Sequence, residues 1–267
     1  MGDRDLLEFR RGYYDLLAGL LAAEPSAALL DRLREGLPGR VHAARQLDPA
    51  LGEGWVVLAD YLDRQPPGTA EAAADEYTRL FIGPGLPPLH PYESYYVTGR
   101  LLDRPLAAVR SFLRSVGLEK DPTQPEPEDW LPFELSVMTR LIDRQRDAGD
   151  PDAAARWVDC QARLLKQHIL IWGPRCADDL SAAPGADLYR GVGRLLRGFL
   201  ELELGLVRDW GPEPVRTLEE ARAAVGSTGT WRGPLFELPV EPSAPDRPPG
   251  PEPGSATPTG PRAPSGA

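Results

Sequence analysis

The stretch LYRGVGRLLRGFLELELGL, residues 188–206, decides the fold class of this chain. Its apolar residues recur at alternating steps of four and three, which places them along one side of an α-helix. These residues are Leu188, Val192, Leu195, Phe199, Leu202 and Leu206. An uninterrupted stripe of this kind is typical of a helix that packs against other helices. The stretch therefore predicts a helical core.

Stripes of the same spacing cover most of the remaining chain up to about residue 226. We expect further helices at residues 5–21, 26–36, 50–64, 70–82, 106–116, 131–142, 150–168, 172–183 and 217–226. No useful run alternates apolar and polar residues with the period of two that a strand requires, and no internal repeat occurs. The sequence thus predicts an all-α protein, a single globular bundle of roughly eight to ten helices.

The chain is predicted to divide into three parts. Residues 1–210 are expected to form the helical domain, with hinge-like loops at 82–96 and 119–130. Residues 211–239 are expected to add a short peripheral helix and an extended segment. Residues 240–267 are rich in proline and contain no aromatic residue, so burial cannot offset the entropy lost on ordering them. We expect a disordered tail there.

Composition and charge exclude two classes of function. No apolar run approaches the roughly 20 residues of a membrane span, so we expect no integral membrane association. Thirty basic residues against forty acidic ones give a net charge of −10, which argues against binding to nucleic acid. Two cysteines are too few for a disulfide framework and fit a reducing compartment. The N-terminal stretch MGDRDLLEFRRGYY predicts a helix, not a secretory leader.

The loop IGPGLPPLHPYESYY, residues 82–96, combines a tight turn with a stiff arm. In the turn, Pro84 fixes its own φ and Gly85 tolerates the positive φ of a type II turn. Three further prolines lead into residues 92–96, where aromatic rings offer apolar contact and Glu93 can orient a peptide. The alternative is that the tyrosines fill the core where the loop re-enters it, with Glu93 capping or pairing locally.

Three separated motifs resemble those of one known family. The first is EYTRLFIGPG at residues 76–85, continued by PYESYY at 91–96. The second is EPEDWLPFELSVM at 126–138, and the third is HILIWGPR at 168–175 with LYRG at 188–191. In this order they resemble the TorD/DmsD/NarJ family, cytoplasmic all-helical chaperones that assist the assembly of molybdenum-cofactor oxidoreductases. The resemblance covers most of the chain up to about residue 205. One departure is Trp130, where the family commonly has histidine.

The resemblance implies binding without catalysis. Such chaperones hold the twin-arginine export leader of a catalytic subunit, or another part of it, until the molybdopterin cofactor is inserted. The implied partner is therefore the catalytic subunit of a molybdopterin-dependent oxidoreductase together with its leader peptide, in the cytoplasm. Relatives can exchange helices across a proline-rich hinge, so a monomer or a domain-swapped dimer is expected. Neither the client nor the region recognised is specified by the sequence.

A twin-arginine leader presents two arginines and an apolar stretch, so its receptor needs carboxylates beside an apolar surface. We expect that surface where residues 82–96 meet residues 126–138. The candidate client-binding residues are Phe81, Pro84, Gly85, Tyr92, Glu93, Ser94, Tyr96, Glu128, Asp129, Trp130 and Glu134, with Glu126 and Phe133 beside them. Asp129 is also well placed to cap the helix that begins at Leu131.

Other chemistry is weakly indicated. His90, His168 and Cys176 suggest a metal site, but His168 shares an apolar stripe and is better explained as a core imidazole. GPGLPP lacks the lysine and the Ser or Thr of a phosphate-binding loop. We expect no catalytic residue, no metal and no resident cofactor. Two alternatives stay open: a nucleotide-dependent regulator or small hydrolase on an all-α scaffold, and a scaffold that recruits partners through its proline-rich tail.

Overall fold

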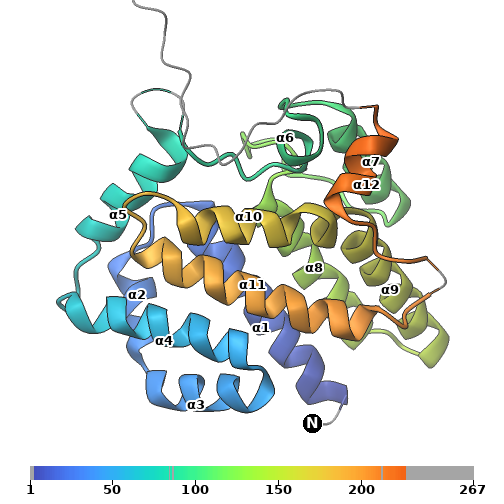
Figure 1. Cartoon of the computed structure of the whole chain (residues 1–267). Coiled ribbons are helices and arrows are strands. Elements are labelled where there is room, and N and C mark those ends of the chain that lie inside the picture. Colours follow the sequence, from blue (N-terminus) through green and yellow to red (C-terminus); the bar gives the residue numbers. More distant parts are fainter. Residues whose placement is uncertain (1–2, 84, 86, 212, 227–267) are drawn as a thin grey trace, which may run out of the picture. The chain divides into compact units, whose positions relative to one another are not determined.

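The computed structural model describes residues 3–83, 85, 87–211 and 213–226. Pro84, residues 227–239 and the predicted tail at 240–267 lie outside the described residues. Within the described part the chain forms twelve α-helices and two π-helical segments and no β-strand (Figure 1). The all-α prediction is confirmed.

The α-helices range from six to twenty residues in length. In chain order the elements are α1 (Asp3–Ala22), α2 (Ala27–Arg34), α3 (Leu37–Leu47), α4 (Pro49–Arg64), α5 (Glu71–Tyr77), η1 (Thr78–Ile82), α6 (Glu93–Thr98), α7 (Arg104–Ser115), α8 (Leu131–Arg146), α9 (Pro151–Leu164), η2 (Leu165–Ile169), α10 (Leu170–Ala182), α11 (Leu188–Val207) and α12 (Leu218–Ala224). A capping box begins α12, with Thr217 as the N-cap and Glu220 as its partner.

Two of these helices were not expected from the sequence. Helix α3 begins after Gly36, whose φ is +67°, and carries Pro38 in its first turn, where the missing amide of proline is harmless. Helix α6 begins at Glu93, inside the predicted loop 82–96. The loop prediction is therefore too long at its C-terminal end. The prolines that precede Glu93 are typical of a loop, and a helix of six residues is too short to show an apolar stripe.

Helix α11 is the centre of the fold and lies between α4 and α10 (Figure 1). Glycines allow α4 and α11 to approach closely. A Cβ atom on Gly198 would lie 2.5 Å from the backbone nitrogen of Leu51, and one on Gly54 would lie 2.6 Å from the Cα atom of Leu195. Such distances leave no space for a side chain at the helix crossing. The backbones of α4 and α11 are therefore in direct contact at the crossing.

A buried ion pair joins the first helix to this centre. Arg10 of α1 donates to both carboxylate oxygens of Glu203 of α11, each at 2.7 Å, and to Oε1 of Gln161 of α9 at 2.8 Å. The hydroxyl of Tyr14 donates to the same carboxylate at 2.6 Å. The group is buried, so its charges are paired inside the protein rather than by water.

Helix α9 continues through the π-helical segment η2 into α10, so the helices expected at 150–168 and 172–183 form one continuous helix. Pro174 lies inside α10 and supplies no amide to the preceding turn. The π-helical segment η2 ends five residues before Pro174, and both features are common where a helix departs from regular α geometry.

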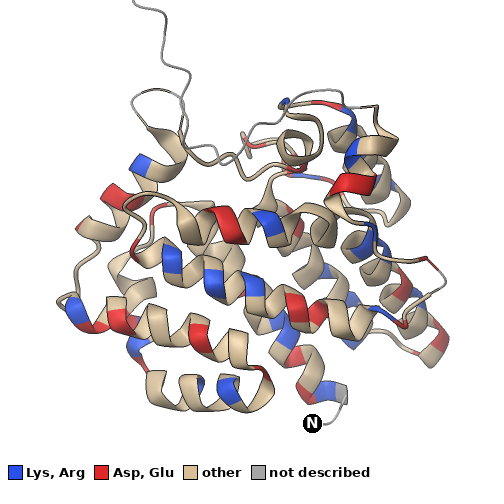
Figure 2. Cartoon of the chain, in the orientation of Figure 1, with Lys and Arg blue, Asp and Glu red and all other residues tan. Residues whose placement is uncertain are grey.

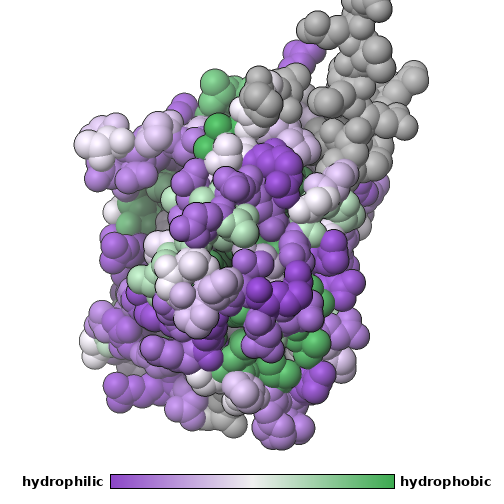
Figure 3. All heavy atoms as spheres, turned by 90° about the vertical axis from the view of Figure 1, so that its left-hand side faces the viewer, coloured by the Kyte–Doolittle hydropathy of each residue, from purple (hydrophilic) through white to green (hydrophobic). Residues whose placement is uncertain are grey.

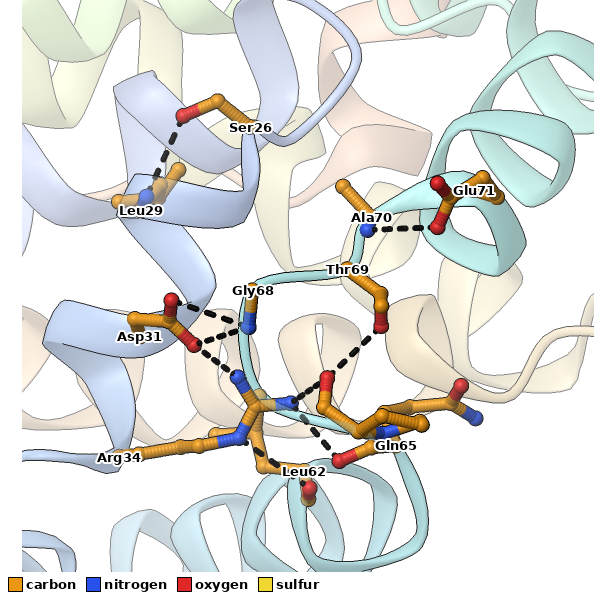
Figure 4. Close-up of polar contacts among 11 residues, drawn as sticks. Ser26, Leu29, Asp31, Arg34, Leu62, Gln65, Gly68, Thr69, Ala70 and Glu71 are labelled. Carbon is orange, nitrogen blue, oxygen red and sulfur yellow. Dashed lines mark hydrogen bonds and ion pairs between the residues drawn. The ribbon is translucent and has the colours of Figure 1, made fainter.

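The turn between α4 and α5 is held against α2 by polar contacts (Figure 4). Asp31 accepts from the amide of Gly68 at 3.1 Å, and Arg34 donates to the carbonyl of Gln65 at 3.1 Å.

On the outer faces of α4, α10 and α11, both signs of charge occur (Figure 2). No helix among the described residues is long and apolar enough to span a bilayer.

Candidate functional site

The two loops that the sequence analysis singled out are joined by a short antiparallel bridge between Tyr92 and Trp130. The amide of Glu93 donates to the carbonyl of Asp129 at 2.8 Å, and the amide of Leu131 donates to the carbonyl of Pro91 at 2.9 Å. We call residues 91–94 with residues 129–131 the clasp. The expected meeting of residues 82–96 with residues 126–138 is therefore present in the structure.

Asp129 caps a different helix from the one expected. One of its carboxylate oxygens accepts from the amide of Ser94 at 3.0 Å, in the first turn of α6. The N-cap of α8 is Trp130, which makes no side-chain capping bond. Since Pro132 has no amide, α8 offers fewer donors to a capping side chain, whereas α6 has no capping side chain of its own. The expected cap on the helix at Leu131 was wrong.

Two residues of the clasp belong to a buried group of titratable side chains, which we call the acidic cluster: Glu93, Asp129, Glu134 and His168. Oε2 of Glu93 lies 2.8 Å from Nδ1 of His168, and the carboxyl group of Glu134 neighbours that of Glu93. Among the described residues, one oxygen of Asp129 and the hydroxyl of Ser94 have no hydrogen-bond partner. His168 is thus a core imidazole held by a carboxyl group, as the sequence suggested.

Burial sets the charge state of this cluster. Desolvation raises the pKa of Glu134 well above its usual value, and the neighbouring carboxylate of Glu93 raises it further. Desolvation likewise raises the pKa of Glu93 and lowers the pKa of His168. All three shifts favour the neutral forms. Glu93 and Glu134 therefore lie inside the protein, where burial favours their uncharged forms, and do not face solvent.

Other predicted residues lie nearer the surface, in the clasp and beside it. Tyr92, Trp130 and Phe133 are half-buried, and the hydroxyl of Tyr92 donates to Oε2 of Glu126 at 2.5 Å. Glu128 forms an ion pair with Arg110 at 2.9 Å. The loop that carries both glutamates is held by Lys120, whose Nζ donates to the carbonyl of Glu126 at 2.6 Å. This set places aromatic rings and carboxylates side by side, partly open to solvent.

The remaining predicted residues lie on either side. Phe81 is half-buried against the rings of Tyr77 and Tyr189, with centroids 4.9 and 5.1 Å away. Gly85 is exposed. Apolar surface is visible near the top of the face that carries α5 and η1 (Figure 3). Tyr96 is buried, and its hydroxyl donates to Oδ2 of Asp179 at 3.1 Å.

Sequence reasoning missed the role of Glu76, the first residue of the first motif. Its carboxylate accepts from the amides of Asp187, Leu188 and Tyr189 at 2.8, 3.0 and 2.8 Å, and so caps α11 from α5. A carboxylate at a helix N-terminus is stabilised both by these donors and by the helix dipole. No local pattern signals this contact, because 111 residues separate Glu76 from Asp187.

No group of three or more His, Cys, Asp or Glu side chains among the described residues is arranged to hold a metal ion. His90 packs its ring on Tyr95, with centroids 4.8 Å apart, and Cys176 is buried. The three residues that suggested a metal site therefore have separate surroundings.

Comparison with known proteins assigns the chain to a family. The family model described as nitrate reductase delta subunit matches residues 44–178, which include α4 to α9, the clasp and all four residues of the acidic cluster. The chain belongs to this family. Its resemblance to the TorD/DmsD/NarJ chaperones is thereby confirmed.

Several relatives in this family are named as chaperones. The chaperone protein TorD of Aeromonas salmonicida is 30% identical over 155 residues, which are 58% of this chain and 69% of that protein. TorD of Vibrio cholerae is 27% identical over 140 residues, 52% of this chain and 63% of its own length. The probable Tat proofreading chaperone DmsD of Haemophilus influenzae is 25% identical over 130 residues, 48% of this chain and 58% of that protein.

Proposed function

We propose that this protein is a redox-enzyme maturation chaperone of the cytoplasm. Its client is the apo catalytic subunit of a molybdopterin oxidoreductase, which it binds through the twin-arginine leader and holds for cofactor insertion before export or assembly. The single observation that carries the proposal is the clasp, which unites an aromatic surface with carboxylates at one place. Relatives named as chaperones, one of them a Tat proofreading chaperone, support it.

The half-buried residues in and beside the clasp are the proposed contact surface. Tyr92, Trp130 and Phe133 offer apolar area to the hydrophobic stretch of a leader, while Glu126 and Glu128 lie beside them as partners for its arginines. Exposed ion pairs contribute only about 0–1 kcal/mol each. Burial of apolar surface, at about 25 cal/mol per Å², supplies most of the affinity. The carboxylates then select basic peptides.

The buried residues of the prediction act indirectly. Asp129 fixes the first turn of α6 and therefore the direction of the arm that carries Tyr92. Glu93 and Glu134 lie in the acidic cluster, where burial favours their neutral forms. We assign these three residues to positioning the contact surface, with no direct bond to a client arginine.

Replacing Trp130 by alanine tests the surface directly. We expect Trp130→Ala to weaken binding of a synthetic twin-arginine leader peptide at least tenfold, or about 1.4 kcal/mol or more, because aromatic anchors dominate peptide interfaces. Isothermal titration calorimetry measures the dissociation constant. The matched control is Trp157→Ala, since Trp157 is also half-buried but lies on α9, stacked under Arg144 at 4.9 Å.

Equal affinities of the two variants would place the binding surface elsewhere. A peptide with both arginines replaced by glutamine separates charge selection from apolar binding, and it should bind less tightly at low salt. Affinity capture of the chain from its native cell then identifies the co-purifying subunit. Turnover of GTP or of an ester by the purified chain would instead favour the regulator or hydrolase alternative.

A further inference from the structure

The segment after α11 returns over the candidate site. We call residues 208–226 the C-terminal strap; the structure describes all of it except residue 212. Its helix, α12, packs against α6 and α10 and lies next to α7 in Figure 1. Leu218 and Ala221, on the inner face of α12, are buried, whereas Ala223 is exposed. Part of the surface of α6 is therefore covered by the chain itself.

A buried lysine fastens the first part of the strap. Nζ of Lys166, in η2, donates to the carbonyls of Trp210 and Glu213 at 2.6 and 2.7 Å, and those of Arg208 and Gly211 lie within 3.5 Å. The side chain of Lys166 is almost fully buried. An ammonium group has three donors, and here they are used on backbone carbonyls of the strap. The first part of the strap is thus held by a charged side chain that lies outside it, in η2.

Two arginines hold the second part of the strap, one within the strap and one on α7. Nε of Arg222 donates to the carbonyl of Tyr96 at 3.0 Å, and Nη1 of Arg104 donates to the carbonyl of Val225 at 2.8 Å. Arg216 lies near enough to Glu93 for its positive charge to oppose the rise in the pKa of that carboxyl, which burial causes. Both Tyr96 and Glu93 belong to the candidate site. The strap therefore brings two arginines and a buried leucine to α6.

We propose that the C-terminal strap is a built-in pseudo-ligand that occupies the surface of α6 and α10 next to the proposed contact surface and is displaced when a leader peptide extends onto it. This inference rests on the proposed function and deepens it, because it names an adjoining surface that the leader also covers. An arginine beside buried apolar side chains, here Arg222 with Leu218 and Ala221, is the chemistry that the strap and a twin-arginine leader share. One arginine of the leader takes the Tyr96 carbonyl that Arg222 uses now, while the other pairs with Glu126 or Glu128.

The proposal predicts that opening the strap tightens client binding. If the binding-competent form is a minor population, the apparent dissociation constant exceeds the intrinsic one by the reciprocal of that fraction. Ala221→Asp buries an unpaired charge under α12 and should release it. The matched control is Ala223→Asp, which adds the same charge to the exposed side of the same helix.

Two measurements on the full-length chain test the proposal. Hydrogen–deuterium exchange of the backbone amides of α12 reports opening without any client. Calorimetry with a synthetic twin-arginine leader peptide reports affinity. For Ala221→Asp we expect exchange in α12 to accelerate and the peptide to bind about tenfold more tightly than it does to Ala223→Asp.

The outcomes separate the strap from the proposed function. Faster hydrogen exchange in α12 with unchanged or weaker peptide binding overturns the strap as a competitor and leaves the proposed function intact. Absence of peptide binding in the native chain and in every variant overturns both. If Ala221→Asp does not fold, Lys166→Met removes the fastening charge while keeping an apolar stem, and Arg64→Gln on α4, whose partners are Asp60 and Asp187, is its control.

Discussion

Glu134 shows how burial alone can set the behaviour of one residue. Its side chain is fully buried, and its pKa is raised first by desolvation and then by the neighbouring carboxyl group of Glu93. A carboxyl group in this setting favours folding while it is protonated and opposes it once it ionises. Its stabilising effect is complete below the ordinary pKa of 4.5 and is lost as pH rises toward the raised value.

Glu134→Gln should therefore flatten the pH dependence of stability above pH 5. We expect the variant to gain stability relative to the native chain between pH 5 and pH 8, by about 1.4 kcal/mol for each unit of pKa shift removed. Urea unfolding at a series of pH values measures the difference. His168 acts in the opposite sense, since burial lowers its pKa and its contribution is lost as pH falls below 6.5.

The control for Glu134 is Glu119→Gln, because Glu119 is exposed in the loop after α7. This variant should follow the native chain at every pH. Parallel pH curves for Glu134→Gln and the native chain would contradict a neutral Glu134.

At the scale of helices, the crossing of α4 and α11 requires glycine because there is no space for a Cβ atom between the two backbones. Gly198→Ala would bring a Cβ atom within 2.5 Å of the Leu51 nitrogen and must push the helices apart. We expect a loss of about 2–4 kcal/mol, in the range of overpacked or cavity-forming core substitutions. Gly205→Ala on the same helix meets nothing within 4 Å and should stabilise by about 0.5–1 kcal/mol. Thermal and urea unfolding compare the pair; similar effects at both positions would contradict the close contact.

Helical periodicity was sufficient to predict most helices from the sequence, because an apolar stripe along one face records which side is buried. It missed α3 and α6, where proline and glycine dominate the local pattern. The meeting of residues 82–96 with residues 126–138 was predicted from the resemblance of the motifs and not from periodicity. Such motifs do not say which members are buried, so Glu93 and Glu134 were expected at the surface.

Other parts of the site were beyond prediction because distant backbone groups supply the partners. Asp129 caps α6 across 35 residues, and Glu76 caps α11 across more than a hundred. A capping side chain is recognisable in sequence only when it lies next to its own helix, as at Thr217. The contacts of Lys166 with the strap are hidden for the same reason, since its partners are carbonyl groups, which every residue has.

At the scale of the molecule, the buried pair of Arg10 and Glu203 connects helices from opposite ends of the described chain. Replacing one partner leaves the other as an unpaired buried charge, which costs about 3–5 kcal/mol. We expect Arg10→Met to lose this amount in urea unfolding. The double variant Arg10→Met with Glu203→Leu should recover a large part, because no charge is then left unpaired.

Tyr14 and Gln161 share the network, so their hydrogen bonds limit the recovery. A double variant less stable than Arg10→Met would show that the pair contributes mainly through those neighbours. Trp210 is a useful reporter, since the guanidinium of Arg10 lies 5.0 Å from its ring centre and its fluorescence should change with the loss of that contact.

The clasp also has a consequence for how client preference can diversify. The amide of Leu131 and the carbonyl of Pro91 are 2.9 Å apart, so the chain from residue 92 to residue 130, which carries α6 and α7, begins and ends at one point. A segment closed at its base can be transplanted between family members as a cassette when its buried contacts with the bundle, Glu93 with His168 and Tyr96 with Asp179, are kept. Chimeras that exchange residues 92–130 would then transfer client choice from one chaperone to another while the scaffold stays the same.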